Sequence, residues 1–243
     1  GKDLQRTLQN GFVYEGTLRG ERGRRIPDGP VDRHDLVYSI QNHDFIGNHP
    51  QGGRLHQITS HDAHRAAAAL MIMTPAIPML FMGEEFACEN PFRFFVDFSD
   101  PSLREAVVQG RRREYPQHDW DAGILPTDPR AFTSAKIGSR DAGNAETVQF
   151  YRRLIELRKR YRASGLLVDK NLSVETDTSN DRYSLCYANE SDSLTIVVRL
   201  SSDSARPQVI EYPIDGQLLL DSRNGDYSTK QKLHRNHAVV FCS

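Results

Sequence analysis

The sequence has little cysteine, little net charge and no long apolar run, and each shortage excludes a class of protein. Only three cysteines occur among the 243 residues, widely spaced at Cys88, Cys186 and Cys242. An odd and dispersed set provides no disulfide framework and no Cys-x-x-Cys metal motif, which fits a reducing compartment. We therefore expect a cytoplasmic protein.

Charge and hydropathy exclude two kinds of partner. The formal net charge is −1, which argues against a nucleic-acid or membrane surface bound through charge. No apolar run approaches the roughly 20 residues of a membrane-spanning helix, and the first residues lack the apolar segment of a secretion signal. The basic run 111–113 is followed by Glu114 and is expected to be a solvated helix face. We expect neither nucleic acid nor a membrane as partner.

Metal ligands are scarce as well. His61 and His64 lie three residues apart and could face one way on a helix. The sequence offers no third ligand beside them, so they are interpreted as surface residues of a first helical turn. We expect no metal and no cofactor.

Up to about residue 165, predicted helices alternate with short apolar strands. Helical patterns cover residues 2–10, 61–73, 102–111 and 146–162. The apolar runs 36–40 and 77–82 predict strands buried on both faces, and the helix between them makes one βαβ unit with parallel strands. Residues 17–34 and most of residues 86–145 are expected to be loops.

The pattern changes after Gly165. Short β runs separated by turn residues predict a small antiparallel sandwich or open barrel; they cover residues 183–187, 194–200, 209–212, 217–220 and 238–241. We place a domain boundary near residue 165.

Polar groups follow both strands of the predicted βαβ unit. Gln41-Asn42-His43-Asp44 follows the first strand, and Gly83-Glu84-Glu85 follows the second. In a β/α barrel the carboxyl ends of parallel strands carry the active site. Each residue also has a structural alternative. Asp44 could cap a turn, His43 could be a buried core residue, and one glutamate could pair with Arg54 or Arg93.

The motifs resemble those of the α-amylase superfamily. Residues 41–44 resemble one of its conserved segments, and residues 74–86 resemble the segment on its eighth barrel strand. The ordered set 11–16, 41–48, 94–97 and 110–115 is similar to one family within it, the malto-oligosyltrehalose trehalohydrolases. The resemblance covers about residues 4–160 and extends more loosely into the β region. His49 and Gly53 depart from the family pattern.

This resemblance implies an α/β plus all-β fold: residues 1–165 form the C-terminal part of a (β/α)8 barrel, and residues 166–243 form a β-sandwich. The implied reaction is retaining hydrolysis of the α-1,4 bond next to the terminal trehalose of maltooligosyl trehalose, which releases trehalose. By its position in the family motif, Asp44 is implied to be the catalytic carboxylate that hydrogen-bonds the sugar hydroxyls in the transition state. The implied substrate-binding residues are His43, Asn42, Gln41 and Glu84.

A retaining glycosidase also needs a nucleophile and an acid/base. The nucleophile motif Gly-x-Arg-x-Asp is absent upstream of Asp44, and Asp32 and Asp35 precede the strand, at the wrong barrel end. We expect the chain alone to be inactive. Its expected partners are maltooligosyl trehalose or a related α-glucan and the missing N-terminal part of the barrel. Without that part, an apolar strand edge should be exposed and cause association.

Two other interpretations stay open. The chain could be a non-catalytic carbohydrate-binding or interaction module, or part of another α-amylase-family enzyme such as a glucan branching enzyme. The aromatic side chains of the middle region could stack on sugars, although core packing is the commoner role; they are Phe92, Phe94, Phe95 and Trp120.

Overall fold

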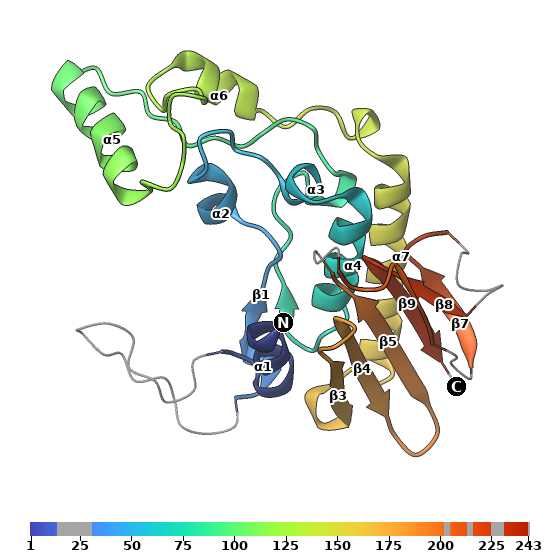
Figure 1. Ribbon diagram of the computed structural model, residues 1–243. Helices are drawn as coiled ribbons and strands as arrows, with labels where there is room; N and C mark the ends of the chain where they lie inside the picture. The colour runs from blue at the N-terminus through green and yellow to red at the C-terminus, as the bar shows by residue number, and fades with distance from the viewer. Residues whose placement is uncertain (14–30, 202–204, 213–215, 225–230, 243) are drawn as a thin grey trace. The chain divides into compact units, whose positions relative to one another are not determined.

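The computed structural model describes residues 1–13, 31–201, 205–212, 216–224 and 231–242. The chain forms two compact units (Figure 1). Unit 1 contains Gly1–Tyr38, Asp62–Met79 and Arg152–Ser243, and unit 2 contains Ser39–His61 and Leu80–Tyr151. The two units interleave along the sequence, and a domain boundary near residue 165 stays a prediction. Most of the loop predicted over residues 17–34 lies outside the described residues.

A five-stranded antiparallel sheet dominates unit 1, with strand order β3-β4-β5-β9-β7. Its strands are β3 (Leu172–Asp177), β4 (Arg182–Ala188), β5 (Ser193–Arg199), β7 (Gln217–Asp221) and β9 (His237–Cys242). A separate ribbon pairs β6 (Val209–Glu211) with β8 (Lys232–His234). The five predicted β runs correspond to β4, β5, β6, β7 and β9, whereas the sequence patterns missed β3 and β8.

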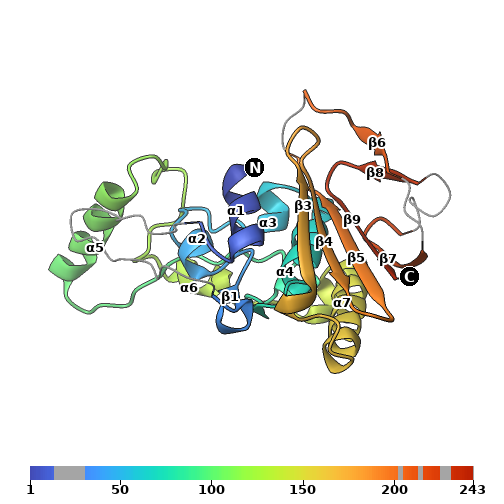
Figure 2. The same ribbon diagram turned by 90° about the horizontal axis from the view of Figure 1, so that it is seen from below.

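One face of the sheet packs on helical segments of unit 1, which are most of α4 and the part of α7 from Arg152 onward. Helix α4 (His61–Ile72) and helix α7 (Ala145–Ala163) lie beside the sheet in both ribbon views (Figures 1 and 2). Tyr187 of β4 donates a hydrogen bond from its hydroxyl to the Met73 carbonyl, just after α4, at 2.7 Å. Leu194, Ile196 and Val198 alternate along β5 on this face and are fully buried. Period-two alternation of apolar residues therefore builds the main core of unit 1.

The opposite face of the sheet is covered by the β6–β8 ribbon. Val197 of β5, Val239 and Phe241 of β9, and Leu233 of β8 form one buried cluster. Because these residues belong to two different sheets, unit 1 contains two packed β layers. This is the arrangement expected for the β region.

A second, much smaller sheet also lies in unit 1. Strands β1 (Val37–Tyr38) and β2 (Ile77–Pro78) pair in parallel, with Val37 opposite Ile77. The Ile77 and Met79 amides donate to the carbonyls of Leu36 and Tyr38 at 2.8 and 2.7 Å. Parallel pairing is as predicted, but both strands are shorter than the predicted runs.

The prediction that these strands are buried on both faces is wrong for the described residues. Val37 is 58% exposed and Ile77 is 52% exposed. The reason is that no further strand or layer, among the residues described, covers this small sheet. Helix α1 (Lys2–Asn10), which the sequence predicted, ends close to it, since the Tyr38 hydroxyl donates to the Gly11 carbonyl at 2.6 Å.

Helices and loops make up unit 2, as the sequence predicted for residues 86–145. The unit contains α2 (His43–Gly47), α3 (Leu55–Ile58), η2 (Glu84–Phe86), α5 (Pro101–Glu114), α6 (Pro129–Ala135) and η3 (Arg140–Ala142). The Asp100 carboxylate accepts from the Ser102 amide at 2.8 Å and so begins α5. The sequence predicted α5 but not α6. The short helices η1 (Arg33–Asp35) and η4 (Asp169–Asn171) belong to unit 1.

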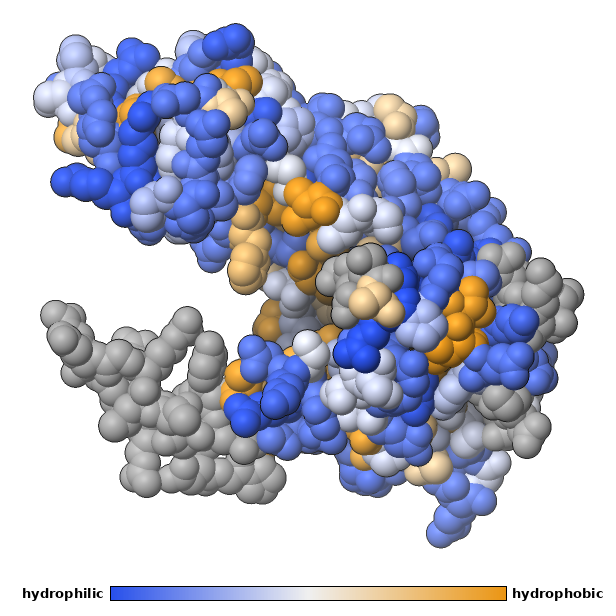
Figure 3. All heavy atoms as spheres, in the orientation of Figure 1, coloured by the Kyte–Doolittle hydropathy of each residue, from blue (hydrophilic) through white to orange (hydrophobic). Residues whose placement is uncertain are grey.

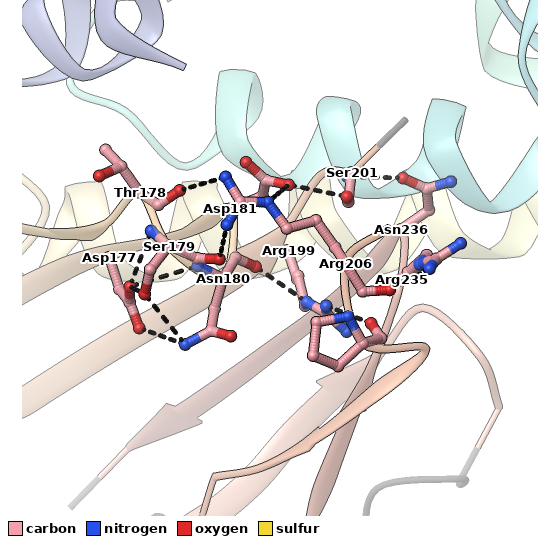
Figure 4. A network of polar contacts seen from close by, with 11 residues as sticks. Asp177, Thr178, Ser179, Asn180, Asp181, Arg199, Ser201, Arg206, Arg235 and Asn236 are labelled. Carbon is pink, nitrogen blue, oxygen red and sulfur yellow. Dashed lines mark hydrogen bonds and ion pairs between the residues drawn. The ribbon is translucent and has the colours of Figure 1, made fainter. Parts of the chain in front are cut away.

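The visible surface is mainly hydrophilic, with small scattered apolar groups (Figure 3). Within the described ranges, none of the helices combines the length and the apolar character needed to span a membrane.

Candidate active site

The predicted site segment 41–44 follows β1 after Ser39 and Ile40, and its last two residues begin α2. Asn42 is the N-cap: its side-chain oxygen accepts hydrogen bonds from the amides of Asp44 and Phe45 at 3.0 and 3.1 Å. This is the usual role of asparagine before a first helical turn. The Asn42 side chain therefore fixes the direction in which the next two residues point.

His43 and Asp44 occupy that first turn and are the exposed part of the site. Their side chains are 72% and 69% exposed, and the His43 Nε2 lies 3.2 Å from the Asp44 Oδ1. The structure therefore places these two predicted residues together, at the surface of unit 2. An exposed imidazole beside an exposed carboxylate offers a donor and an acceptor to a polar ligand.

Gln41 and Glu84 form a second, buried part of the site. Gln41 is 3% exposed and accepts a hydrogen bond from the Leu55 amide at 3.1 Å. Glu84 is 1% exposed and accepts from the Tyr151 hydroxyl at 2.9 Å and from the Phe81 amide at 3.3 Å. Contacts of this kind match the structural role that the sequence left open for Glu84.

Burial controls the ionisation of Glu84. Loss of solvent raises the pKa of this carboxyl from 4.5 to about 7, although Tyr151, Gln41 and the Phe81 amide favour its charged form. Burial also raises the pKa of the Tyr151 hydroxyl, and the charge of Glu84 raises it further. Sequence reasoning placed Tyr151 only on the inner face of a helix. Its contact with Glu84 joins residues 67 positions apart, and no local pattern signals such a pair.

Arg54 and Gly83 hold the backbone that carries Glu84. Arg54 is fully buried and donates from Nε to the Asn90 carbonyl at 2.6 Å and from a terminal nitrogen to the Met82 carbonyl at 2.8 Å. Burial lowers the pKa of Arg54, which the nearby charges of Cys88, Glu84 and Glu85 oppose. Gly83 has a φ of +80°, and a Cβ there would lie 2.8 Å from the Cys88 Cβ. The sequence left open an ion pair between Arg54 and a glutamate. In the structure, Arg54 donates its hydrogen bonds to main-chain carbonyls.

A further cluster holds the end of α2, and it corrects a prediction. Arg111 donates to the Asn48 side-chain oxygen at 2.6 Å, and its guanidinium lies 3.7 Å from the centre of the Phe94 ring. Asn48 in turn donates to the Tyr115 hydroxyl at 2.6 Å. The prediction of a solvated basic face is therefore wrong for Arg111, because aromatic and amide groups surround its guanidinium.

This cluster lies close to the exposed carboxylate. Partial desolvation raises the pKa of Tyr115, and the charges of Glu114 and Asp44 raise it further. Trp120 is 7% exposed and donates to the Tyr115 carbonyl at 3.0 Å. Packing is thus the role observed for Trp120, as the sequence favoured. Among the described residues, no group of three or more metal-ligating side chains is present.

Solved structures define the class of fold. A Salmonella typhimurium protein provisionally assigned as an alpha amylase matches 100% of this chain and 41% of its own, with a TM-score of 0.80 and 26% identity. An isomaltulose synthase mutant from Erwinia rhapontici matches 85% of this chain with a TM-score of 0.52 and 16% identity, which shows likeness of fold alone. The chain therefore has the fold of part of an α-amylase-type protein.

Sequence relatives sharpen this class. The malto-oligosyltrehalose trehalohydrolase of Saccharolobus solfataricus is 36% identical over 229 residues, which are 91% of this chain and 36% of the relative. Enzymes of the same name from Deinococcus radiodurans and a Rhizobium species are 39% and 37% identical over 64% of this chain and 28% of their own length. The predicted resemblance to the malto-oligosyltrehalose trehalohydrolases is confirmed, and the chain is a relative of these enzymes.

The match covers only part of the length of these relatives. The chain spans about a third of the length of the curated relatives it matches. No protein-family model matches the chain.

Proposed function

We propose that these residues are part of a retaining glycoside hydrolase that cleaves the α-1,4 bond next to the terminal trehalose of maltooligosyl trehalose and releases trehalose. One observation carries the proposal. An exposed carboxylate and imidazole, Asp44 and His43, project from a turn fixed by Asn42, within a sequence 36% identical to a trehalohydrolase.

Asp44 acts in this proposal on the sugar hydroxyls and not on the scissile bond. Its two oxygens accept hydrogen bonds that strengthen as the sugar ring acquires positive charge in the transition state. His43, beside it at 3.2 Å, donates to the same ring. Such charge-assisted bonds are stronger than those between neutral groups.

Gln41, Asn42 and Glu84 act mainly as positioning residues in this scheme. Asn42 has its side-chain oxygen occupied by two backbone amides. The buried Gln41 oxygen is occupied by the Leu55 amide, and both Glu84 oxygens accept hydrogen bonds from protein groups. These contacts favour support of the Asp44 turn over direct contact with sugar.

The nucleophile and the acid/base are the two carboxylates that the proposal does not assign. The residues before Asp44 contain no Gly-x-Arg-x-Asp segment. We therefore infer that residues 1–243 alone do not cleave the substrate, and that the missing barrel part supplies both groups. The substrate is maltooligosyl trehalose or a related α-glucan, in a cytoplasmic setting.

The substitution Asp44→Asn tests the proposal. It is made in the full-length protein that the gene containing these residues encodes. Trehalose release from maltooligosyl trehalose should fall at least about 100-fold, equivalent to about 3 kcal/mol, with little change in KM. Asp35→Asn is the matched control, because Asp35 precedes β1 while Asp44 follows it. Unchanged turnover in Asp44→Asn would remove this carboxylate from the mechanism.

The absence of the nucleophile motif also favours a second candidate, a carbohydrate-binding module without catalysis. Maltodextrin binding by the full gene product without any bond cleavage would support it. Branched glucan in place of free trehalose would instead indicate a glucan branching enzyme.

A further inference from the structure

A pocket of about 340 Å³ lies in unit 2, among residues that the proposed mechanism does not use. Its wall comes from the segment before α5 and from the start of α6. The residues that matter here are Phe95, Asp97, Thr127, Asp128, Phe132 and Thr133. The volume falls within the range of about 300–1,000 Å³ that small-molecule sites occupy.

Two phenyl rings form the apolar part of the pocket. The rings of Phe95 and Phe132 lie 5.1 Å apart, centre to centre, at an interplanar angle of 61°. They are 39% and 48% exposed, so both retain accessible surface. In the space-filling view, apolar atoms lie within hydrophilic surface in the area that α5 and α6 occupy in Figure 1 (Figure 3).

The two walls are held by backbone contacts. The Val96 amide donates to the Pro126 carbonyl at 2.9 Å, which fixes the segment that carries Phe95. The Asp128 carboxylate accepts from the Arg130 amide at 2.8 Å, which begins the helix that carries Phe132. These contacts hold the backbone that carries the two rings, and a preformed backbone reduces the entropy lost on binding.

The polar part of the pocket offers one carboxylate for a ligand. Asp128 is occupied, because Arg130 donates to it from its side chain at 2.6 Å as well. Asp97 is exposed, and its carboxylate has no hydrogen bond or ion pair within the parts of the chain that the structure covers. The hydroxyl-bearing residues Thr127 and Thr133 complete the lining. A free carboxylate accepts strong hydrogen bonds from hydroxyl donors.

We propose that this pocket binds a glucose unit of the α-glucan chain, as a subsite separate from the Asp44 turn. A sugar ring has an apolar C–H face for the phenyl rings and hydroxyl groups for Asp97. Two carboxylates disfavour an anionic ligand by like-charge repulsion. The Lys136 ammonium already lies 4.9 Å from the Phe132 ring centre, which disfavours a cationic one. The choice of an α-1,4-linked glucan rests on the proposed function.

Calorimetric titration of the full gene product with maltoheptaose tests the pocket. Phe132→Ala and Phe95→Ala should each raise the Kd at least about tenfold, a loss of about 1.4 kcal/mol. Phe98→Ala is the matched control, since Phe98 is 43% exposed in the same segment but does not line the pocket. Its Kd should stay within twofold of the unaltered protein.

The substitution Asp97→Asn removes the negative charge of the carboxylate but leaves both phenyl rings and the pocket volume unchanged. It should weaken maltoheptaose binding several-fold while the melting temperature is unchanged. If the Phe132, Phe95 and Asp97 variants all bind maltoheptaose with the Kd of the unaltered protein, the proposed subsite is wrong.

Trehalose release, measured in parallel, separates the two proposals. If the Phe132 variant loses glucan binding but no preparation releases trehalose, the subsite stands and the proposed reaction fails. If trehalose release depends on Asp44 while the pocket variants bind maltoheptaose normally, the reaction stands and the subsite fails.

Discussion

The five-stranded sheet and the two-stranded parallel sheet of unit 1 are built from similar apolar residues and differ in how far these residues are buried. Ile196 and Val197 of β5 have no exposed surface, whereas Val37 of β1 and Ile77 of β2 are 58% and 52% exposed. Strand β5 pairs with β4 on one side along its full length, and with β9 on the other side from Leu194 to Arg199. Within the described part of the chain, strands β1 and β2 pair only with each other, over two residue pairs.

The difference shows that an apolar run determines the tendency of a segment to be buried, while its neighbours determine whether burial is reached. Parallel sheets in proteins are almost always covered on both faces. The small parallel sheet has the composition of such a sheet without the cover. This is the arrangement expected if further strands complete the small sheet.

Substituting one isoleucine in each sheet sharpens this comparison and has the largest expected effect. Ile196→Ala should lower the free energy of unfolding by about 2–5 kcal/mol, because it leaves a cavity in a closed core. Ile77→Ala should change it by less than about 0.5 kcal/mol, since the side chain is already half in solvent. Urea unfolding of the two variants measures both values. Similar losses in both would show that Ile77 is buried in solution.

Glu84 gives a test of intermediate size, because the segment after the exposed β2 strand buries a carboxyl group. Its pKa is raised from 4.5 to about 7, so the folded protein binds this proton more tightly than the unfolded chain. Stability therefore falls as the pH rises from about 4.5 to about 7 and is constant above that range. The expected loss is about 3 kcal/mol.

Glu84→Gln removes this titration. The free energy of unfolding of the variant, minus that of the unaltered protein, should increase by about 3 kcal/mol between pH 4 and pH 8. The same substitution at the exposed Glu105 serves as the control. A difference that is independent of pH would mean that Glu84 reaches solvent in the folded protein.

Self-association should respond to the exposed strand pair, with the smallest effect on stability. Apolar, unpaired strand edges promote pairing between chains. Ile77→Thr should lower the fraction of oligomers at a given concentration, measured by sedimentation velocity, with stability changed by less than about 0.5 kcal/mol. Leu103→Thr is the control, because Leu103 is 49% exposed but lies on α5. An equal reduction in both variants would indicate unspecific association.

Most helices could be predicted because their signals are local. The runs over α1, α4, α5 and α7 have helical periodicity, and Asp100 is also a side-chain N-cap for α5. Helix α6 had a usable signal that was missed, since Asp128 and Pro129 form an N-cap and first position. Strands β3 and β8 were missed because few of their residues are buried; in β8 only Leu233 is.

The site divides in the same way. The sequence placed His43 and Asp44 in a short polar segment after a strand, but it predicted neither α2 nor the N-cap role of Asn42. The Tyr151–Glu84 and Arg111–Asn48 contacts join residues 67 and 63 positions apart. Only the tertiary fold brings such residues together. The sequence pattern predicted Tyr151 on the inner face of a helix and Arg111 on a solvated face, and neither pattern names a partner.

The two carbonyl contacts of Arg54 act as a non-covalent cross-link. By binding the Met82 and Asn90 carbonyls at once, one rigid guanidinium closes the loop over residues 83–89. A disulfide stabilises by restricting the unfolded chain. The hydrogen bonds of Arg54 form only on folding, so they must offset the entropy lost when the loop closes. A lysine has the charge without the planar fork of donors. The planar guanidinium of Arg54 therefore joins the two ends of this loop, and Tyr151 holds Glu84 within it.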